Sequence, residues 1–153
     1  MSQLSTAVEL AELDAFISAA LATHCLANPA VVSVERIGDT PPSWYVRLHG
    51  EAKENYSAEF TLGQRSLHFA TYFIPAPEEN LADFYRYLLV HNTRLFGVAF
   101  TVHEDGGVYL EGRLPNSMIT APDEIDRVLG SLYSHTEEMF DAAARIGFES
   151  RFA

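Results

Sequence analysis

His103, Glu104 and Asp105, followed by two glycines, form the stretch of the sequence that most resembles a chemical site. A histidine beside two carboxylates could bind a metal ion or transfer a proton. The stretch lies between two segments of alternating apolar and polar residues, and Asp-Gly is a strong signal for a hairpin turn. Neighbouring side chains in a strand point to opposite sides, so His103 and Glu104 would diverge. The sequence therefore predicts a turn here rather than a catalytic or metal site.

The other candidate side chains lack the spacing of a known site. The six histidines form no H-x-H or H-E-x-x-H pattern, and Cys25 has no second cysteine with which to share a zinc ion. The sequence shows no nucleophile elbow, phosphate-binding loop or dinucleotide fingerprint. The acidic pairs Glu78–Glu79 and Glu137–Glu138 are predicted to be solvated on helix surfaces, where adjacent side chains do not face each other. We therefore predict no catalytic residue, no cofactor and no metal.

Length, charge and composition limit the classes to which the chain can belong. Its 153 residues are the usual size of one domain, and we expect a single domain over residues 1–153. The net charge of −11 argues against binding to nucleic acid or to an anionic membrane surface, since both require basic residues. No run of about 18 uncharged apolar residues predicts a membrane-spanning helix. With one cysteine and no recognisable signal peptide, we expect a cytoplasmic protein.

Residue periodicity predicts the elements that must position these side chains. Apolar residues recur every three or four positions in helical segments and every second position in strands. The predicted order is a helix over 6–27, strands over 31–37, 43–49, 56–62 and 67–73, a helix over 81–95, strands over 98–103 and 108–113, and a helix over 122–146. Thr120 and Asp123 are expected to cap the last helix. The class is α+β, an antiparallel sheet with helices on one face, in the order α-β-β-β-β-α-β-β-α.

Strand alternation assigns the aromatic residues to two opposite faces of this sheet. One face must pack on the helices and carries Trp44, Val46, Leu48, Phe60, Phe69, Phe73, Phe100, Val102 and Leu110. The opposite face, called the outer face below, carries Tyr45, Arg47, His49, His68, Tyr72, His103, Tyr109 and Arg113. Tyrosine and arginine are enriched in protein interfaces, so we expect this face to bind a partner. Two alternatives remain open: the tyrosines only stabilise the sheet as cross-strand pairs, or a second copy of the chain covers the face.

Residues 81–115 carry a resemblance to a known family. The segment combines a helix that ends in a leucine pair and an asparagine, a strand–Asp-Gly–strand hairpin, and a closing Gly-Arg-Leu-Pro. The matching residues are Leu88, Leu89, Asn92, Asp105, Gly106, Gly112, Arg113, Leu114 and Pro115. With the following helix, which contains LGSLYSHTEEMFD, the chain resembles the YbjN-domain family, especially its actinobacterial members. The second glycine of the turn, Gly107, lengthens the turn relative to the family pattern.

The resemblance implies a fold similar to that of the type III secretion chaperones. Those chaperones are small, acidic and usually dimeric proteins that bind a secreted partner and have no catalytic residues. Members of the YbjN-domain family look like regulatory or chaperone-like binders, and no catalytic motif comes with the resemblance. A shared fold is weak evidence for a shared activity, so the activity of this chain has to be inferred from its own surface residues.

Three functional hypotheses follow from these observations. The first is a non-enzymatic protein-binding module, chaperone-like or regulatory, which fits the acidic charge and the absent catalytic pattern. The second is a small-molecule sensor or an enzyme whose site is built from scattered residues. The third is a structural subunit of a larger assembly. A deep pocket with converging polar groups would favour the second hypothesis, and a shallow groove over the sheet would favour the first. We also expect a homodimer, from the resemblance and from the extra apolar area of Phe96, Tyr109 and Phe152.

Overall fold

The computed structural model describes residues 3–152, in which three α-helices, six strands and two short 3₁₀ helices follow one another. In chain order these are α1 (Ala7–Ala27), β1 (Val31–Asp39), β2 (Pro42–His49), β3 (Asn55–Leu62), β4 (Ser66–Ile74), α2 (Leu81–Asn92), β5 (Ala99–Val102), β6 (Val108–Pro115), η1 (Asn116–Met118), α3 (Pro122–Gly147) and η2 (Glu149–Phe152). The α+β class and the predicted order of helices and strands are confirmed.

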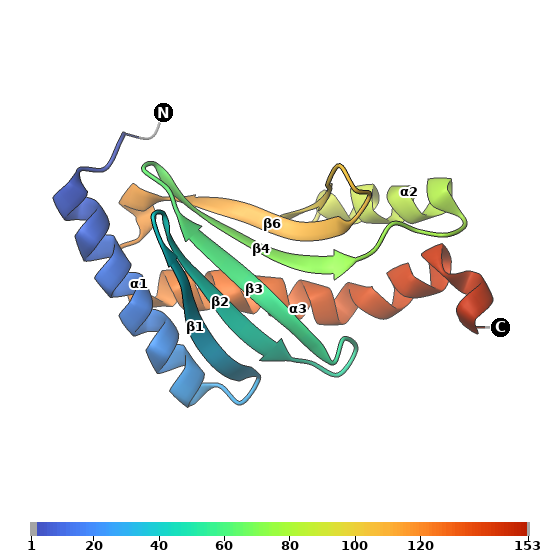
Figure 1. Ribbon diagram of the computed structural model, residues 1–153. Helices are drawn as coiled ribbons and strands as arrows, with labels where there is room; N and C mark the ends of the chain where they lie inside the picture. The colour runs from blue at the N-terminus through green and yellow to red at the C-terminus, as the bar shows by residue number, and fades with distance from the viewer. Residues whose placement is uncertain (1–2, 153) are drawn as a thin grey trace.

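The six strands form one antiparallel sheet in the order β1-β2-β3-β4-β6-β5 (Figure 1). Short turns join β1 to β4 as a meander, as predicted. Helix α2 then carries the chain to the far edge, where the four-residue strand β5 pairs with β6. Strand β6 inserts between β4 and β5, so Tyr109 lies opposite Tyr72 on one side and opposite Thr101 on the other. This register decides which side chains from distant segments share a row of the sheet.

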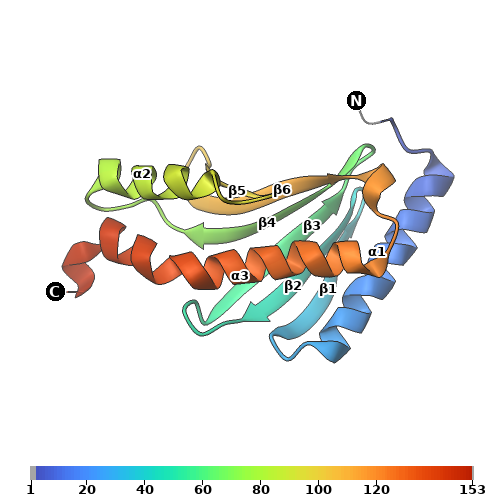
Figure 2. The same cartoon turned by 180° about the vertical axis from the view of Figure 1, so that it is seen from behind.

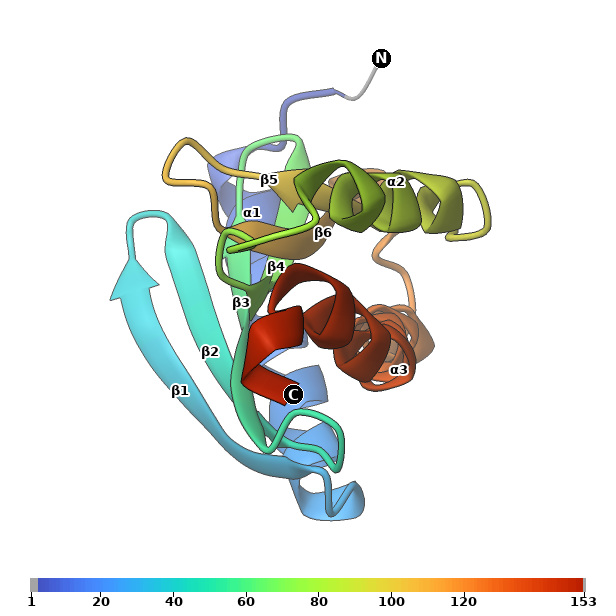
Figure 3. The same ribbon diagram turned by 90° about the vertical axis from the view of Figure 1, so that its right-hand side faces the viewer.

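All three helices lie on the same side of the sheet (Figures 2 and 3). Helix α3 runs across the strands, and α1 contacts both α3 and β1. The core between the two layers contains Trp44, Phe60 and Phe73 from the strands and Ile125 and Leu129 from α3, all at most 2% exposed. Full burial of one such side chain contributes about 1.5–3 kcal/mol to stability. Figure 1 looks onto the outer face, over which no helix of residues 3–152 passes.

Two residues outside the core layer hold the short edge strand β5 in place. The side chain of Asn92, the last residue of α2, pairs with the backbone of Phe100: its Oδ1 accepts from the amide at 2.7 Å, and its Nδ2 donates to the carbonyl at 3.2 Å. Gly112 of β6 leaves room for the segment that leads into β5, because a Cβ there would collide with the carbonyl oxygen of Gly97. The asparagine and the glycine of the sequence pattern therefore both serve the attachment of β5.

Two local expectations from the sequence were wrong. Val102 was assigned to the packed face, but it is 52% exposed because it is the last residue of an edge strand. Thr120 and Asp123 do not cap the last helix. Its N-cap residue is Ala121, which makes no side-chain cap hydrogen bond. Pro122 begins the helix, in the first turn as the sequence indicates, since its fixed φ suits that position and it has no amide that needs a partner.

Among the described residues, α1 alone is long and apolar enough by composition to span a membrane, which differs from the expectation drawn from its acidic residues. In this fold, Ile17 and Leu21 of α1 are completely buried. Asp14 forms a bidentate ion pair with Arg36 of β1, with N–O distances of 2.6 and 2.8 Å. Length and composition alone do not distinguish a helix that packs on a protein core from a helix that spans a membrane.

Candidate partner-binding face of the sheet

The structure places the eight predicted residues on the outer face of the sheet. Seven of them occupy strand positions that alternate with buried ones, and His103 directly follows β5. The register brings His68 of β4 opposite Arg113 of β6. His49 lies at the end of the β2–β3 hairpin, opposite Asn55. The predicted residues therefore share a face, although they do not form one cluster.

Three aromatic side chains of this face contact one another. The rings of Tyr72 and Tyr109 meet edge to face, with centroids 5.3 Å apart and an angle of 79°. The ring of His103 stacks on the ring of Tyr109, with centroids 3.8 Å apart and an angle of 19° between the ring planes. Burial, together with the neighbouring Tyr109 and Asp105, raises the pKa of Tyr72. Tyr72 thus stays a neutral phenol in ordinary buffers, with 41% of its surface exposed.

Glu111 of β6 joins three strands through a hydrogen-bond cluster. Its carboxylate lies 2.8 Å from Nε2 of His68 on β4 and 2.6 Å from Nε2 of His103 beyond β5, and it accepts a short hydrogen bond from the hydroxyl of Thr101. Burial opposes its charge, but the hydrogen bonds from His103, Thr101 and His68 outweigh that effect and lower the pKa of Glu111 to about 2. The cluster therefore fixes a carboxylate and both histidines in one geometry.

A hollow of about 630 Å³ opens beside this cluster on the outer face. Its lining includes the rings of Tyr45, Tyr72 and Tyr109 and the carboxylate residue Glu59. The hollow exists because small residues occupy the strand positions between the tyrosines, with Ser57 on β3 and Ala70 on β4. The outer face thus combines exposed aromatic surface with a depression in which a side chain could lie.

Lys53, in the loop between β2 and β3, closes one end of the hollow. Its ammonium donates to the carbonyls of Tyr72 at 2.5 Å and Phe73 at 2.9 Å. It also lies 5.2 to 5.6 Å from the ring centroids of Tyr56, Tyr72 and Phe140. Burial lowers the pKa of Lys53 to about 8. These contacts show how the amino group is held in place from both the sheet and α3.

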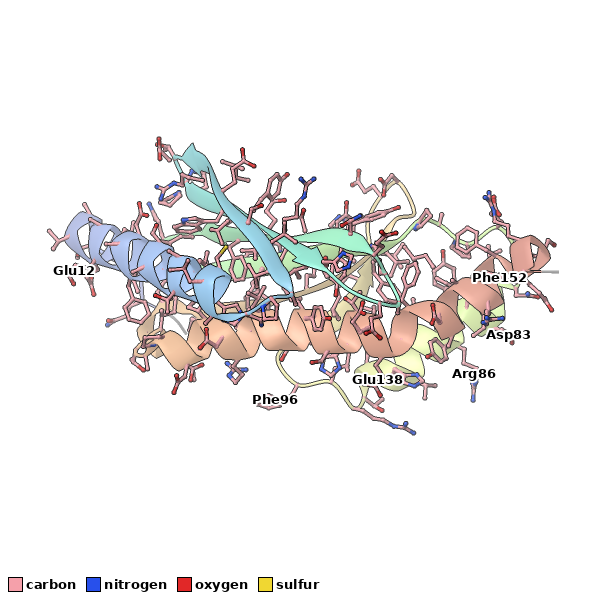
Figure 4. The ribbon with its side chains drawn as sticks, turned by 90° about the horizontal axis from the view of Figure 1, so that it is seen from below. Glu12, Asp83, Arg86, Phe96, Glu138 and Phe152 are labelled. Atoms are coloured by element: carbon pink, nitrogen blue, oxygen red, sulfur yellow. The ribbon has the colours of Figure 1, made fainter. Side chains whose placement is uncertain are left out.

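Three of the four carboxylates in the two acidic pairs that were predicted to be solvated have structural roles, which corrects the sequence interpretation. Glu137 of α3 is half-buried and accepts hydrogen bonds from the backbone amides of residues 51–53, at 2.5, 3.0 and 3.3 Å. It thereby holds the loop that carries Lys53. Glu78 and Glu79 precede α2 rather than belong to it, and bind Arg151 and Ser150 near the C-terminal end. Glu138 remains exposed on α3, away from the outer face (Figure 4).

The opening stretch of the sequence forms the predicted turn. The amide of His103 bonds the carbonyl of Gly107 at 2.9 Å, and Gly106 adopts a positive φ of 88°. In residues 3–152, no group of three His, Cys, Asp or Glu side chains is placed to hold a metal ion. The sequence argument missed the role of His103, because its partner Glu111 lies across the hairpin and not beside it. The sequence argument also missed that Lys53 and Glu59 line the hollow. The only hint in the sequence was the set of tyrosines predicted on the same face.

The fold and the face define an α+β domain in which helices cover one side of an antiparallel sheet and an aromatic, hydrogen-bonded side is left open. The chain belongs to the YbjN family: residues 32–145 match the family described as "YbjN: Putative bacterial sensory transduction regulator". The family predicted from residues 81–115 is thus confirmed.

Relatives of the chain occur in mycobacteria. An uncharacterized protein of Mycobacterium tuberculosis is 38% identical over 115 residues, which cover 75% of this chain and 62% of the relative. An uncharacterized protein of Mycobacterium leprae is 37% identical over 105 residues, or 69% of this chain and 56% of the relative. The chain therefore matches about three-fifths of the length of these relatives.

Two solved complexes contain a chain of similar fold. One is the ExsC–ExsE complex, with a TM-score of 0.58, 16% identity, and coverage of 84% of this chain and 94% of the other. The second is the heterodimeric ExoU–SpcU complex from the type III secretion system of Pseudomonas aeruginosa, with a TM-score of 0.50, 14% identity, and coverage of 63% and 80%. At these identities the similarity concerns the fold, and the expected likeness in fold to secretion chaperones is confirmed.

Proposed function

We propose that this protein is a non-enzymatic protein-binding module, chaperone-like or regulatory, whose partner binds the outer face of the sheet. The observation that carries the proposal is the exposed tyrosine surface around the hollow, on a side of the sheet that no helix of residues 3–152 covers. Tyrosine supplies a large contact area at a low cost in side-chain entropy, and its hydroxyl adds a hydrogen bond. The structural neighbours, which are protein–protein complexes, support a protein as the partner.

The partner-binding residues in this proposal are those of the outer face: Tyr45, Arg47, His49, His68, Tyr72, Tyr109 and Arg113. The exposed tyrosines form the contact surface, and the hydrogen-bond cluster around Glu111, on the same face, ties β4, β6 and the end of β5 together beside them. Such preorganisation reduces the entropy lost on binding. A sensor or enzyme would instead need polar groups that converge in an enclosed pocket, whereas the hollow opens to solvent on the outer face and four of its nine lining residues are tyrosines.

The proposal includes a cytoplasmic setting and a protein partner rather than nucleic acid or membrane. A net charge of −11 disfavours close approach to phosphate groups, whether in nucleic acid or in anionic lipid. The same charge favours approach of a basic protein segment.

Replacement of Tyr45, Tyr72 and Tyr109 by serine, singly and together, tests the proposed surface. Tyr45 and Tyr72 are each 41% exposed, so their single variants should fold with a melting temperature close to that of the parent. Tyr109→Ser removes a half-buried ring that contacts Tyr72 and His103, so it should lower the melting temperature, and the triple variant is used at a temperature at which it stays folded. The triple variant should lose proteins that co-purify with the parent. A control in which Val8 and Leu26, both exposed on α1, become serine should retain them. If the folded triple variant keeps every partner of the parent, the outer face is not the binding surface.

A further inference from the structure

The row of side chains through Tyr45 indicates the chemistry of the partner. Tyr45 lies directly opposite Glu35 of β1 on one side and Glu59 of β3 on the other. Cross-strand neighbours have Cβ atoms about 4.5–5.5 Å apart, so the phenol ring stands between two carboxylates. The floor of the hollow continues this row, because Glu59 lies opposite Ala70. An exposed aromatic ring is therefore flanked by negative charge on both sides.

These two carboxylates differ from Glu111 of the same row, whose charge is already bound by two histidines and a threonine. Within residues 3–152, the side-chain carboxylates of Glu35 and Glu59 have no hydrogen-bond or ion-pair partner. Both are exposed. Their negative charge is thus available to a group that enters the hollow from outside.

A guanidinium group matches this arrangement better than an ammonium group. Arginine stacks its planar head on an aromatic ring and donates two parallel hydrogen bonds to a carboxylate, whereas lysine offers a compact, strongly hydrated charge. The volume of about 630 Å³ is ample for one arginine side chain. The ammonium of Lys53 at the end of the hollow is already engaged by two backbone carbonyls, which leaves the end near Tyr45 for the incoming cation.

We infer that the outer face binds a basic protein segment that places an arginine side chain in the hollow, stacked on Tyr45 and paired with Glu59. This inference rests on the proposed function and adds the charge class of the partner. The net charge of −11 steers such a segment toward the protein, and the hollow selects the arginine at close range. Glu35 adds attraction from the edge strand without a direct role in the hollow.

Binding of a synthetic peptide tests the inference without knowledge of the natural partner. The probe is a fluorescein-labelled peptide of about ten residues in which arginine alternates with serine, and the matched probe carries uncharged citrulline in place of arginine. The parent should bind the arginine peptide more tightly than the citrulline peptide, as measured by fluorescence anisotropy. Glu59→Gln and Tyr45→Leu should each weaken binding by about two- to fivefold, the range for an exposed ion pair or cation–π contact.

The matched control is Glu138→Gln, which removes the same charge from the helical side and should change binding by less than about twofold. Equal weakening by Glu59→Gln and Glu138→Gln would show only general attraction between opposite charges and would overturn the inference. Equal binding of the two peptides to the parent, or no binding of either, would also overturn it. The serine variants of the three tyrosines test the proposed function separately. If these variants lose natural partners while the parent fails to bind the arginine peptide, the proposed partner-binding face stands and only the proposed arginine contact is overturned.

Discussion

Glu111 is the residue whose chemistry is most strongly set by its neighbours. Its pKa is lowered from 4.5 to about 2 in the folded chain, so between these values the unfolded chain binds more protons than the folded chain. Its contribution to stability is therefore complete above about pH 4.5 and is lost as the pH falls toward 2. We predict that Glu111→Gln lowers the free energy of unfolding at pH 6 by about 1–2 kcal/mol, as measured by urea denaturation.

The same variant should change the shape of the pH profile. The stability of the parent should fall more steeply than that of Glu111→Gln between pH 4.5 and the lowest pH at which both still fold. Glu59→Gln is the matched control, because the carboxylate of Glu59 has no hydrogen bond to lose within residues 3–152, and its profile should follow that of the parent. Parallel profiles for Glu111→Gln and the parent would mean that the cluster does not hold the carboxylate as described.

Residue types alone could predict the face but not the contacts on it. Alternation correctly placed Tyr45, Tyr72 and Tyr109 on one face, because every second side chain in a strand points to the same side of the sheet. The meeting of His68 with His103 on Glu111 depends on β6 lying between β4 and β5, and on its register with each. His68 and Glu111 are 43 residues apart, and nothing in the local pattern of either residue encodes that pairing.

Strand β5 is the element that depends most on a single backbone position. A methyl group at Gly112 would collide with the Gly97 carbonyl and lie 3.0 Å from the ring of Phe69, so either β5 or the core must move. We predict that Gly112→Ala lowers the free energy of unfolding by about 2–3 kcal/mol. Urea denaturation measures the loss, and amide hydrogen exchange should locate the loosened hydrogen bonds in β5.

Gly130 offers a control for the same substitution in another element. It lies on the exposed side of α3, where an added Cβ would meet no atom within 4 Å. Gly130→Ala should therefore stabilise the chain by about 0.5–1 kcal/mol through helix propensity. Similar stability changes for both alanine variants would contradict the close crossing of Gly97 over Gly112.

At the scale of elements, the existence and type of each segment followed from periodicity, and the boundaries did so to within a few residues. The position of β6 in the sheet did not follow, because both edges of a four-stranded meander are open to a later hairpin. The N-cap of α3 was assigned wrongly for a different reason. Pro122 at the start of the helix is enough to begin it, so a side-chain cap by Thr120 and Asp123 is not needed.

For the whole molecule we predict a homodimer, although the three aromatic residues first named for it do not form one patch. Phe96 lies in the link between α2 and β5, Phe152 lies near the C-terminal end, and Tyr109 lies on the outer face (Figure 4). Leu89 and Val102 are 65% and 52% exposed, and they line a small apolar depression of about 140 Å³ beside the free edge of β5. Such a surface at an unpaired edge strand is suited to burial against a second copy.

Light scattering on a sizing column at micromolar concentration measures the assembly. The expected mass is twice the monomer mass of 17.0 kDa. Replacement of Leu89 and Val102 by serine should shift the mass to that of one chain, whereas serine at the exposed Leu26 of α1 should leave it unchanged. Elution of the parent as a single species of 17.0 kDa would contradict the predicted dimer.

The central claim is that the partner touches the outer face, and contact mapping inside the cell tests it most directly. A photoreactive phenylalanine analogue replaces Tyr45 in one variant and Glu138, on the helical side, in another. After irradiation, the variant at position 45 should form a covalent adduct with a second, different protein, and the variant at position 138 should not. Adducts only from position 138, equal adducts from both, or adducts at position 45 that contain only a second copy of the chain would contradict the claim.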